Sequence, residues 1–225
     1  MTATPFGAVL FDCDGVLVDS EGAANRVWVA LLAAHGLAFA PADFLLYSVG
    51  RTLSGLYAGL ERDFGWTRPP TFDAELDAAL QLVFRTMRPV PGAPELLAAL
   101  RAAGLPFAVA SNSRRDRLDL KLAASGLAPL LAGRVHDPSQ VARGKPAPDL
   151  YLHAASGLGV APARCLVVED SVLGVSAGVA AGMTVWGFMG GDHSGEHAAP
   201  TLLAAGAART FGRLADLGSA LGVPL

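Results

Sequence analysis

The chain of 225 residues carries 17 basic and 20 acidic side chains, for a formal charge of −3, and 52% of its residues are hydrophobic. This length fits one large domain or a domain with a modest insertion, and no apolar run approaches the roughly 18 to 20 residues that a membrane-spanning helix needs. The near-neutral charge argues against a nucleic-acid partner, and two cysteines are too few for a disulfide framework. We therefore expect a cytoplasmic protein without a membrane or nucleic-acid partner, with a monomer as the default state.

Four short apolar runs predict the strands of a parallel sheet. They do not alternate between polar and apolar residues, which is typical of strands buried on both faces. Helical patterns that end at glycine separate the later runs, as in a series of strand–helix–strand units. The predicted strands are 8–11, 106–110, 165–168 and 184–188, and the predicted helices are 94–103, 114–125, 148–156 and 172–181. These elements predict an α/β fold with a Rossmann-like parallel sheet.

The stretch from residue 20 to residue 88 interrupts this rhythm, because it has helical patterns throughout. Helices are predicted over 21–35, 53–64 and 72–88. An all-helical insertion after the first strand predicts a cap over one edge of the sheet, with hinges at 16–20 and 89–92. The predicted domains are a core formed by 1–19 and 89–225 and a cap formed by 20–88.

Polar and acidic residues follow three of the predicted strands. They are Asp12 and Asp14 after the first, Ser111 and Asn112 after the second, and Glu169 and Asp170 after the third. In an open α/β sheet, ligands bind in the crevice outside the carboxyl ends of the strands. We therefore expect these side chains to face one site.

The residue types at this crevice suit phosphate chemistry. Asp12 and Asp14 would repel each other unless a cation or a proton lies between them, and such carboxylates can bind Mg²⁺ or act as a nucleophile and an acid. Alternatively, they are a turn or capping pair, just as Ser111 can be an ordinary helix N-cap rather than part of a phosphate site. Lys145 is one of two lysines beside fifteen arginines, which suggests a role for a compact positive charge. The other, Lys121, lies in a predicted helix and is assigned no role.

Four segments resemble, in order, the motifs of the haloacid dehalogenase-like superfamily. They are FDCDGVLVDS (11–20), VASNS (109–113), RGKPAPD (143–149) and VEDS (168–171). Each segment is short, but their order over nearly the whole chain is specific. The similarity is to the subgroup with a small helical cap, which includes β-phosphoglucomutase and many sugar-phosphate phosphatases.

The resemblance implies a Mg²⁺-dependent phosphatase for a small phosphorylated metabolite, with a sugar phosphate as the first expectation. Asp12 would attack phosphorus and form an aspartyl-phosphate, and Asp14 would protonate the leaving oxygen and later activate water. Mg²⁺ would be held by the Asp12 carboxylate, the Asp14 carbonyl and Asp170, with Glu169 either on the ion or behind one of its ligands. The phosphoryl oxygens would be held by three groups: Ser111, Asn112 and Lys145.

The resemblance also leaves other functions open. A mutase of the β-phosphoglucomutase type is the first alternative, although Ala24 stands where those mutases have a hinge histidine, and no hinge group is expected to couple Asp14 to an acceptor. Asp14 argues against a dehalogenase, which needs no second carboxylate. From another class, a non-catalytic phosphate-binding or receiver-like module would carry similar residues but no helical cap.

Weaker signals lie in the cap and in one late loop. Related caps use an arginine near the position of Arg51 to hold a second anionic group, and Glu21 would face the crevice from the hinge; ordinary helix-end charges explain both residues equally well. The loop 190–197 contains two histidines and two acids; a second metal is not expected there, and contact with substrate stays open. Cys13 is expected to pack as a small hydrophobe. Trp28 and Trp66 are predicted in the cap core.

Overall fold

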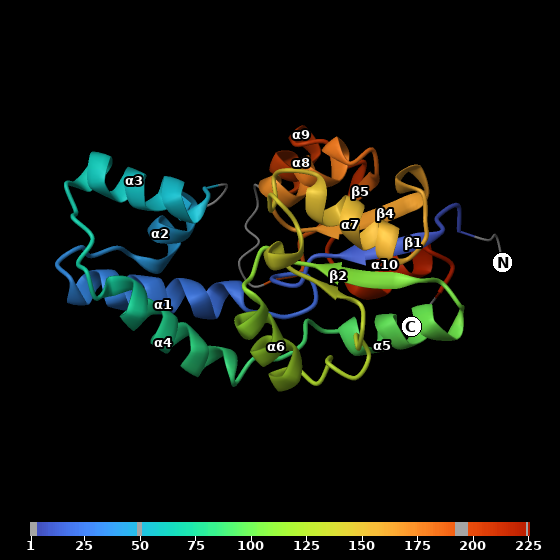
Figure 1. Ribbon diagram of the computed structural model, residues 1–225, viewed down its shortest axis with the longest axis horizontal. Helices are drawn as coiled ribbons and strands as arrows, with labels where there is room; N and C mark the ends of the chain where they lie inside the picture. Colours follow the sequence, from blue (N-terminus) through green and yellow to red (C-terminus); the bar gives the residue numbers. More distant parts are fainter. Residues whose placement is uncertain (1–3, 49–50, 192–197, 224) are drawn as a thin grey trace.

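The computed structural model describes residues 4–48, 51–191, 198–223 and 225, and these form a parallel sheet flanked by helices, with a further group of helices beyond one end of it (Figure 1). The strands are β1 (Ala8–Phe11), β2 (Phe107–Ala110), β3 (Val135–His136), β4 (Cys165–Glu169), β5 (Thr184–Phe188) and β6 (Arg209–Phe211). The α-helices are α1 (Glu21–Ala34), α2 (Pro41–Ser48), α3 (Leu53–Phe64), α4 (Phe72–Phe84), α5 (Ala93–Ala102), α6 (Arg115–Ala124), α7 (Asp149–Gly157), α8 (Val172–Ala180), α9 (Ala198–Ala204) and α10 (Leu214–Ala220). No helix among these residues is long and apolar enough to cross a membrane.

The strands lie in the order β3-β2-β1-β4-β5-β6, and each neighbouring pair is parallel. Strand β1 is central and fully buried: Val9 and Phe11 pack into one apolar cluster with α5, α6 and α10, whereas Ala8 and Leu10 pack into a second with α7, α8 and α9. Alternate residues thus serve opposite faces of the sheet, as strand geometry requires. The predicted α/β, Rossmann-like parallel-sheet fold is confirmed.

The main differences from the predicted elements are short segments. Strands β3 and β6 and helices α2, α9 and α10 were not predicted, and α4 ends at Phe84 rather than at residue 88. Most of the predicted helix ends at glycine are correct: Gly104, Gly126 and Gly182 follow their helices and adopt positive φ. Gly157 is instead the last residue of α7, and the left-handed residue there is Gly159.

Helices α1 to α4 occupy the range predicted as the cap and lie at one end of the sheet (Figure 1). Leucine and aromatic side chains pack between them. Phe72 contacts the rings of Trp28, Tyr57 and Trp66 at centroid distances of 5.7, 6.3 and 4.9 Å. The two tryptophans therefore pack in this helical group, although Trp28 is only partly buried.

The chain crosses between the sheet and these helices twice, and the two crossings lie side by side. Val18 and Pro89 form an antiparallel bridge. The N–H of Asp19 donates to the carbonyl of Arg88 (3.1 Å), and the N–H of Val90 donates to the carbonyl of Leu17 (2.9 Å). The crossings coincide with the two predicted hinges, and the boundaries at 19/20 and 88/89 remain a prediction.

Candidate active site

Asp12 lies directly beyond the buried end of β1, where its carboxylate meets Lys145 and a buried glutamate. The ammonium of Lys145 donates to Oδ1 of Asp12 and to Oε1 of Glu169, both at 2.6 Å, and it lies 4.6 Å from the ring centroid of Tyr151. Asp12 is 8% exposed, Lys145 6% and Glu169 0%. Three segments far apart in the chain thus bring two carboxylates onto one cation.

Glu169 is held from all sides. Besides the bond from Lys145, its carboxylate accepts hydrogen bonds from the hydroxyls of Tyr151 and Ser171 and from the backbone N–H groups of Asp170 and Ser171. Gly174, in the first turn of α8, leaves the space that this carboxylate fills, since a Cβ atom there would overlap it. Glu169 therefore orients Lys145 and the turn that carries Asp170.

Asn112 pins the Lys145 segment to the end of β2. Its Oδ1 accepts from the N–H of Lys145 (2.8 Å), and its Nδ2 donates to the carbonyl of the same residue (2.9 Å). The segment passes so closely that a Cβ on Gly144 would lie 2.6 Å from Asn112 Oδ1. The Asn112 amide group thus positions Lys145, and a contact between Asn112 and phosphate would have to come from the backbone N–H.

Hydrogen-bond donors surround the Asp14 carboxylate. Among them, only Ser111 was predicted as a site residue. Oδ2 accepts from Lys121 Nζ (2.6 Å), Ser113 Oγ (2.8 Å) and Ser111 Oγ (3.3 Å). Oδ1 accepts from Lys121 and from Ser20 at the hinge. Lys121, which was assigned no role from the sequence, therefore bonds to Asp14, and Ser20 brings a hinge residue to the same carboxylate. That no hinge group couples Asp14 to an acceptor stays a prediction.

The two aspartates have opposite electrostatic environments. Burial raises the pKa of Asp12 well above its ordinary value; Lys145 opposes this, but the carboxylates of Glu169, Asp170 and Asp14 add to it. Burial also acts to raise the pKa of Asp14. There the charge of Lys121 and the hydrogen bonds from Lys121, Ser20 and Ser113 prevail, so the pKa lies below its ordinary value. Asp14 is held as a carboxylate, and Asp12 lies in a region of excess negative charge.

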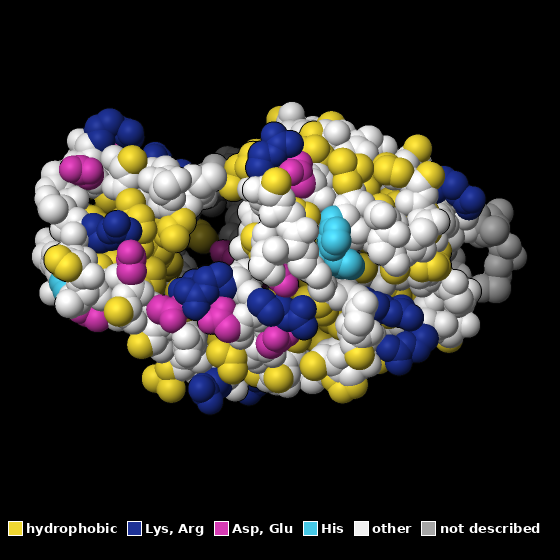
Figure 2. Space-filling view, viewed as in Figure 1, with side chains coloured by type: hydrophobic (Ala, Val, Ile, Leu, Met, Phe, Trp, Pro, Cys, Tyr) yellow, Lys and Arg dark blue, Asp and Glu magenta, His cyan; other side chains and the backbone are white. Residues whose placement is uncertain are grey.

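A cavity of about 310 Å³ opens from Asp14 toward α1 to α4, and a hollow is visible between these helices and the sheet part of the molecule (Figure 2). The predicted cap residues Arg51 and Glu21 both line it, together with Ala24, Asn25 and the partly buried Trp28. Arg51 is fixed against α2: its Nε donates to the carbonyl of Tyr47 (2.8 Å), and its guanidinium lies 4.3 Å from the Tyr47 ring centroid.

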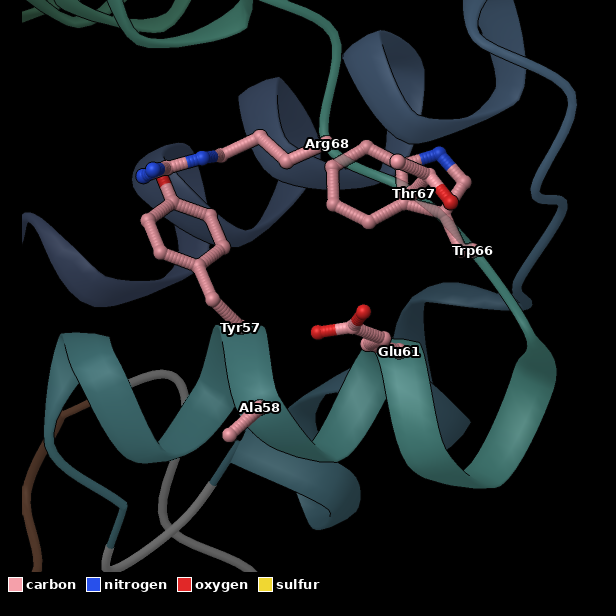
Figure 3. A pocket seen from close by; sticks show the side chains of 6 residues that line it. All are labelled: Tyr57, Ala58, Glu61, Trp66, Thr67 and Arg68. Atoms are coloured by element: carbon pink, nitrogen blue, oxygen red, sulfur yellow. The ribbon is translucent and has the colours of Figure 1, made fainter.

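A second hollow, of about 330 Å³, lies within the helical group alone (Figure 3). Tyr57, Ala58 and Glu61 of α3 form one side, and Trp66, Thr67 and Arg68 of the following segment form the other. The guanidinium of Arg68 covers the Tyr57 ring at 4.4 Å. None of the predicted site residues lines this hollow. Of the loop 190–197, residues 192–197 lie outside the described residues.

The sequence profile of the haloacid dehalogenase-like hydrolase family matches residues 6–182, which include all four motif segments of the site. The chain belongs to the haloacid dehalogenase-like hydrolase family. Hexitol phosphatase A from Escherichia coli K12 is 37% identical over 184 residues, or 78% of this chain and 80% of that protein.

Two further proteins are similar to this chain. A hydrolase from Deinococcus radiodurans R1, solved with bound phosphate and sodium, is 45% identical with a TM-score of 0.84, and the match covers 97% of this chain and 96% of that one. The bifunctional riboflavin kinase/FMN phosphatase of Arabidopsis thaliana is 32% identical over 178 residues. That match covers 79% of this chain but only 47% of the plant protein, so the chain spans about half of that relative.

Proposed function

We propose that this hydrolase is a Mg²⁺-dependent phosphatase that cleaves a small phosphorylated metabolite, with a sugar or polyol phosphate as the first expectation, through an aspartyl-phosphate on Asp12. The reaction class, hydrolysis of a phosphoric monoester, follows from the family and its phosphatase relatives. One observation carries the finer proposal: Asp12 and Asp14 each lie beside a separate buried lysine, and Asp14 with its partner Lys121 lines a cavity wide enough for a metabolite.

The charges at the site fit a divalent cation. The carboxylates of Asp12, Asp14, Glu169 and Asp170 face two ammonium groups, those of Lys121 and Lys145, so two formal negative charges remain. Among the described residues, no three acidic, histidine or cysteine side chains converge closely enough to enclose a metal by themselves. Mg²⁺ does not require such a cage, since it usually binds one or two carboxylates together with waters and substrate phosphate.

The residues that would hold Mg²⁺ are Asp12, through its carboxylate, Asp14, through its carbonyl, and Asp170. The five donors to Glu169 support the alternative in which it lies behind the metal ligands and holds Lys145. Bound Mg²⁺ would supply positive charge for the phosphoryl oxygens and keep Asp12 ionised. The Deinococcus relative was solved with bound phosphate, which supports a phosphate-binding function for this chain.

In the first step, Asp12 Oδ attacks phosphorus, the bond to the leaving oxygen breaks with its electron pair, and Asp14 gives that oxygen a proton. Asp14 can carry this proton because a phosphate bound beside it is a like charge, which raises its pKa. In the second step, Asp14 takes a proton from water, the hydroxide oxygen attacks phosphorus, and the electron pair of the broken bond returns to Asp12. Ser111 and Lys145 hold the phosphoryl oxygens through both steps.

Helices α1 to α4 act as the cap in this proposal, with Arg51 and Glu21 facing the part of the substrate beyond the phosphate. A mutase is the competing function, and Ser20 is an observation in its favour, because it links the hinge to Asp14. Ala24 still provides no hydrogen-bonding side chain in this cavity, so we expect water to be the acceptor. Incubation with β-glucose 1-phosphate and a trace of glucose 1,6-bisphosphate is expected to release inorganic phosphate or nothing; accumulation of glucose 6-phosphate would favour the mutase.

A screen of phosphorylated metabolites for phosphate release tests the proposal directly. We expect Mg²⁺-dependent turnover that chelator abolishes and Ca²⁺ inhibits, because the larger Ca²⁺ binds with a looser coordination sphere. Asp12→Asn should lose at least about 10³-fold of the turnover, and beryllofluoride should bind the wild type only. Asp116→Asn, on the exposed side of α6, is the matched control. Full activity in excess chelator, or retained turnover in Asp12→Asn, would contradict the proposal.

A further inference from the structure

Lys121 is a charged residue at the site that lies outside the four motif segments. It lies on α6 between Leu118 and Leu122, on the buried face of that helix, and is 1% exposed. Its ammonium donates to both carboxylate oxygens of Asp14 and to Ser113 Oγ (2.7 Å). It also lies 5.0 Å from the ring centroid of Phe84, at the end of α4. One side chain thus joins the turn after β1, the end of β2 and the helical group.

A buried ammonium is stable only when it is paired and hydrogen-bonded, because removing it from water is costly. Here its partner is Asp14, the carboxylate that the proposed mechanism uses for proton transfer and that therefore needs a defined orientation. Since Lys121 bonds to both oxygens, rotation of the Asp14 carboxylate about its χ2 bond would break at least one charge-assisted hydrogen bond. The serine hydroxyls complete the set but carry no charge.

We propose that Lys121 is a positioning residue that fixes the Asp14 carboxyl group for proton exchange with the leaving oxygen and then with water. This inference rests on the proposed phosphatase function. Without Lys121, Asp14 would be oriented only by hydroxyl groups on a turn whose Gly15 has a φ of 74°, and its reach toward the leaving oxygen would no longer be fixed. Positioned acid–base groups contribute about 10² to 10⁴-fold to a rate.

The dependence on leaving group separates this role from a purely structural one. The parameter kcat/KM reports the steps up to formation of the aspartyl-phosphate. An alkyl phosphate such as a hexitol phosphate needs a proton on its leaving oxygen, whereas p-nitrophenyl phosphate does not. Lys121→Met should therefore lower kcat/KM at least about 100-fold for the alkyl ester and less than about 10-fold for the aryl ester. Equal losses for both esters would overturn the proposal.

A double-mutant cycle provides the second readout. If Lys121 acts only through Asp14, then Asp14→Asn combined with Lys121→Met should be no slower than Asp14→Asn alone. Additive losses would overturn the proposal. Arg115→Met removes an exposed cation from the same helix, one paired with Asp119, and should match the wild type for both esters.

A milder variant covers the case in which Lys121→Met does not fold. Ser113→Ala keeps the buried charges and removes the hydroxyl that accepts from Lys121 and donates to Asp14. In Ser113→Ala, kcat/KM should fall about 10-fold for the alkyl ester and less for the aryl ester. An equal fall for both esters would overturn the proposal. A wild type that hydrolyses neither ester would overturn the proposed function itself, whereas an active wild type with uniform losses overturns the role of Lys121 alone.

Discussion

Gly174→Ala is the substitution for which helix propensity and the structure give opposite predictions. In an ordinary helix, replacing glycine by alanine stabilises by about 1 kcal/mol. At position 174 the added Cβ would fall on the carboxylate of Glu169, well inside the 3.0 Å that real Cβ atoms keep from other atoms. Glu169 is fully buried, so it cannot move away without leaving its partners.

The loss of stability in Gly174→Ala can be estimated from the partners of Glu169. Glu169 accepts five hydrogen bonds, one of them from the Lys145 ammonium. A hydrogen bond to a charged group contributes about 1.5 to 3 kcal/mol, and separating a buried ion pair costs about 3 to 5 kcal/mol. Subtracting the helix gain leaves a net destabilisation of at least about 3 kcal/mol, against a typical total stability of about 5 to 15 kcal/mol.

Urea denaturation followed by tryptophan fluorescence measures this difference. Gly22→Ala in α1 is the matched control, because its Cβ would come no closer than 3.6 Å to Arg26; it should change stability by less than about 1 kcal/mol, in the stabilising direction. We also expect Gly174→Ala to lose activity where the protein remains folded, since Lys145 is released. A variant as stable and active as the wild type would refute the reasoning.

Three further predictions concern other parts of the molecule. Arg117 donates to Asp77 across the α4–α6 boundary (2.6 Å) and holds the pKa of Asp77 below its ordinary value. Asp77→Asn should therefore cost about 1 kcal/mol at pH 7, and the difference should shrink as the pH falls below about 3.9, the ordinary pKa of aspartate; a gap that stays constant in acid denaturation curves contradicts it. Burial, with His153 nearby, lowers the pKa of His136, so the unfolded state gains a proton more readily and stability should fall below about pH 6.5; His136→Phe should flatten the stability curve between pH 7 and pH 5, and parallel curves would count against it. Gly59→Ala would bring a Cβ within 2.5 Å of the Tyr47 hydroxyl and 2.6 Å of the Arg51 guanidinium, which packs on Tyr47. If Arg51 contacts the substrate, its displacement should raise KM for the metabolite about tenfold and leave p-nitrophenyl phosphate unaffected; an equal change for both would exclude that contact.

The parts predicted from the sequence are those in which local pattern and tertiary environment agree. The run 8–11 is apolar because both faces of the central strand are buried, and the polar residues beyond it mark the strand end. Strand β3 has two half-buried residues and β6 has three residues, of which Arg209 is exposed, so neither carries an apolar pattern. Their position at the sheet edges follows from pairing with β2 and β5, which a local pattern does not contain.

The site shows the same division. Most motif positions were found because they follow a strand end, and Lys145 because lysine is rare in this chain. Lys121 is 107 residues from Asp14 and meets it only through the packing of α6. A signal was present: Lys121 follows Leu118 by three positions and so falls on the apolar face of its helix. The use of the Asn112 amide was not predictable, because it depends on how closely the chain passes at Gly144.

The pairing of Val18 with Pro89 also has a consequence for chain entropy. Because the two ends of the helical insertion are hydrogen-bonded to each other, the whole segment is a closed loop attached to the sheet. The cost of closing a loop grows only with the logarithm of its length, about 0.6 kcal/mol for each doubling. The entropic cost of closing the loop would therefore be almost the same for a longer or shorter helical segment. The part of the molecule that meets the substrate can thus vary in size while Asp12, Lys145 and Glu169 keep their places.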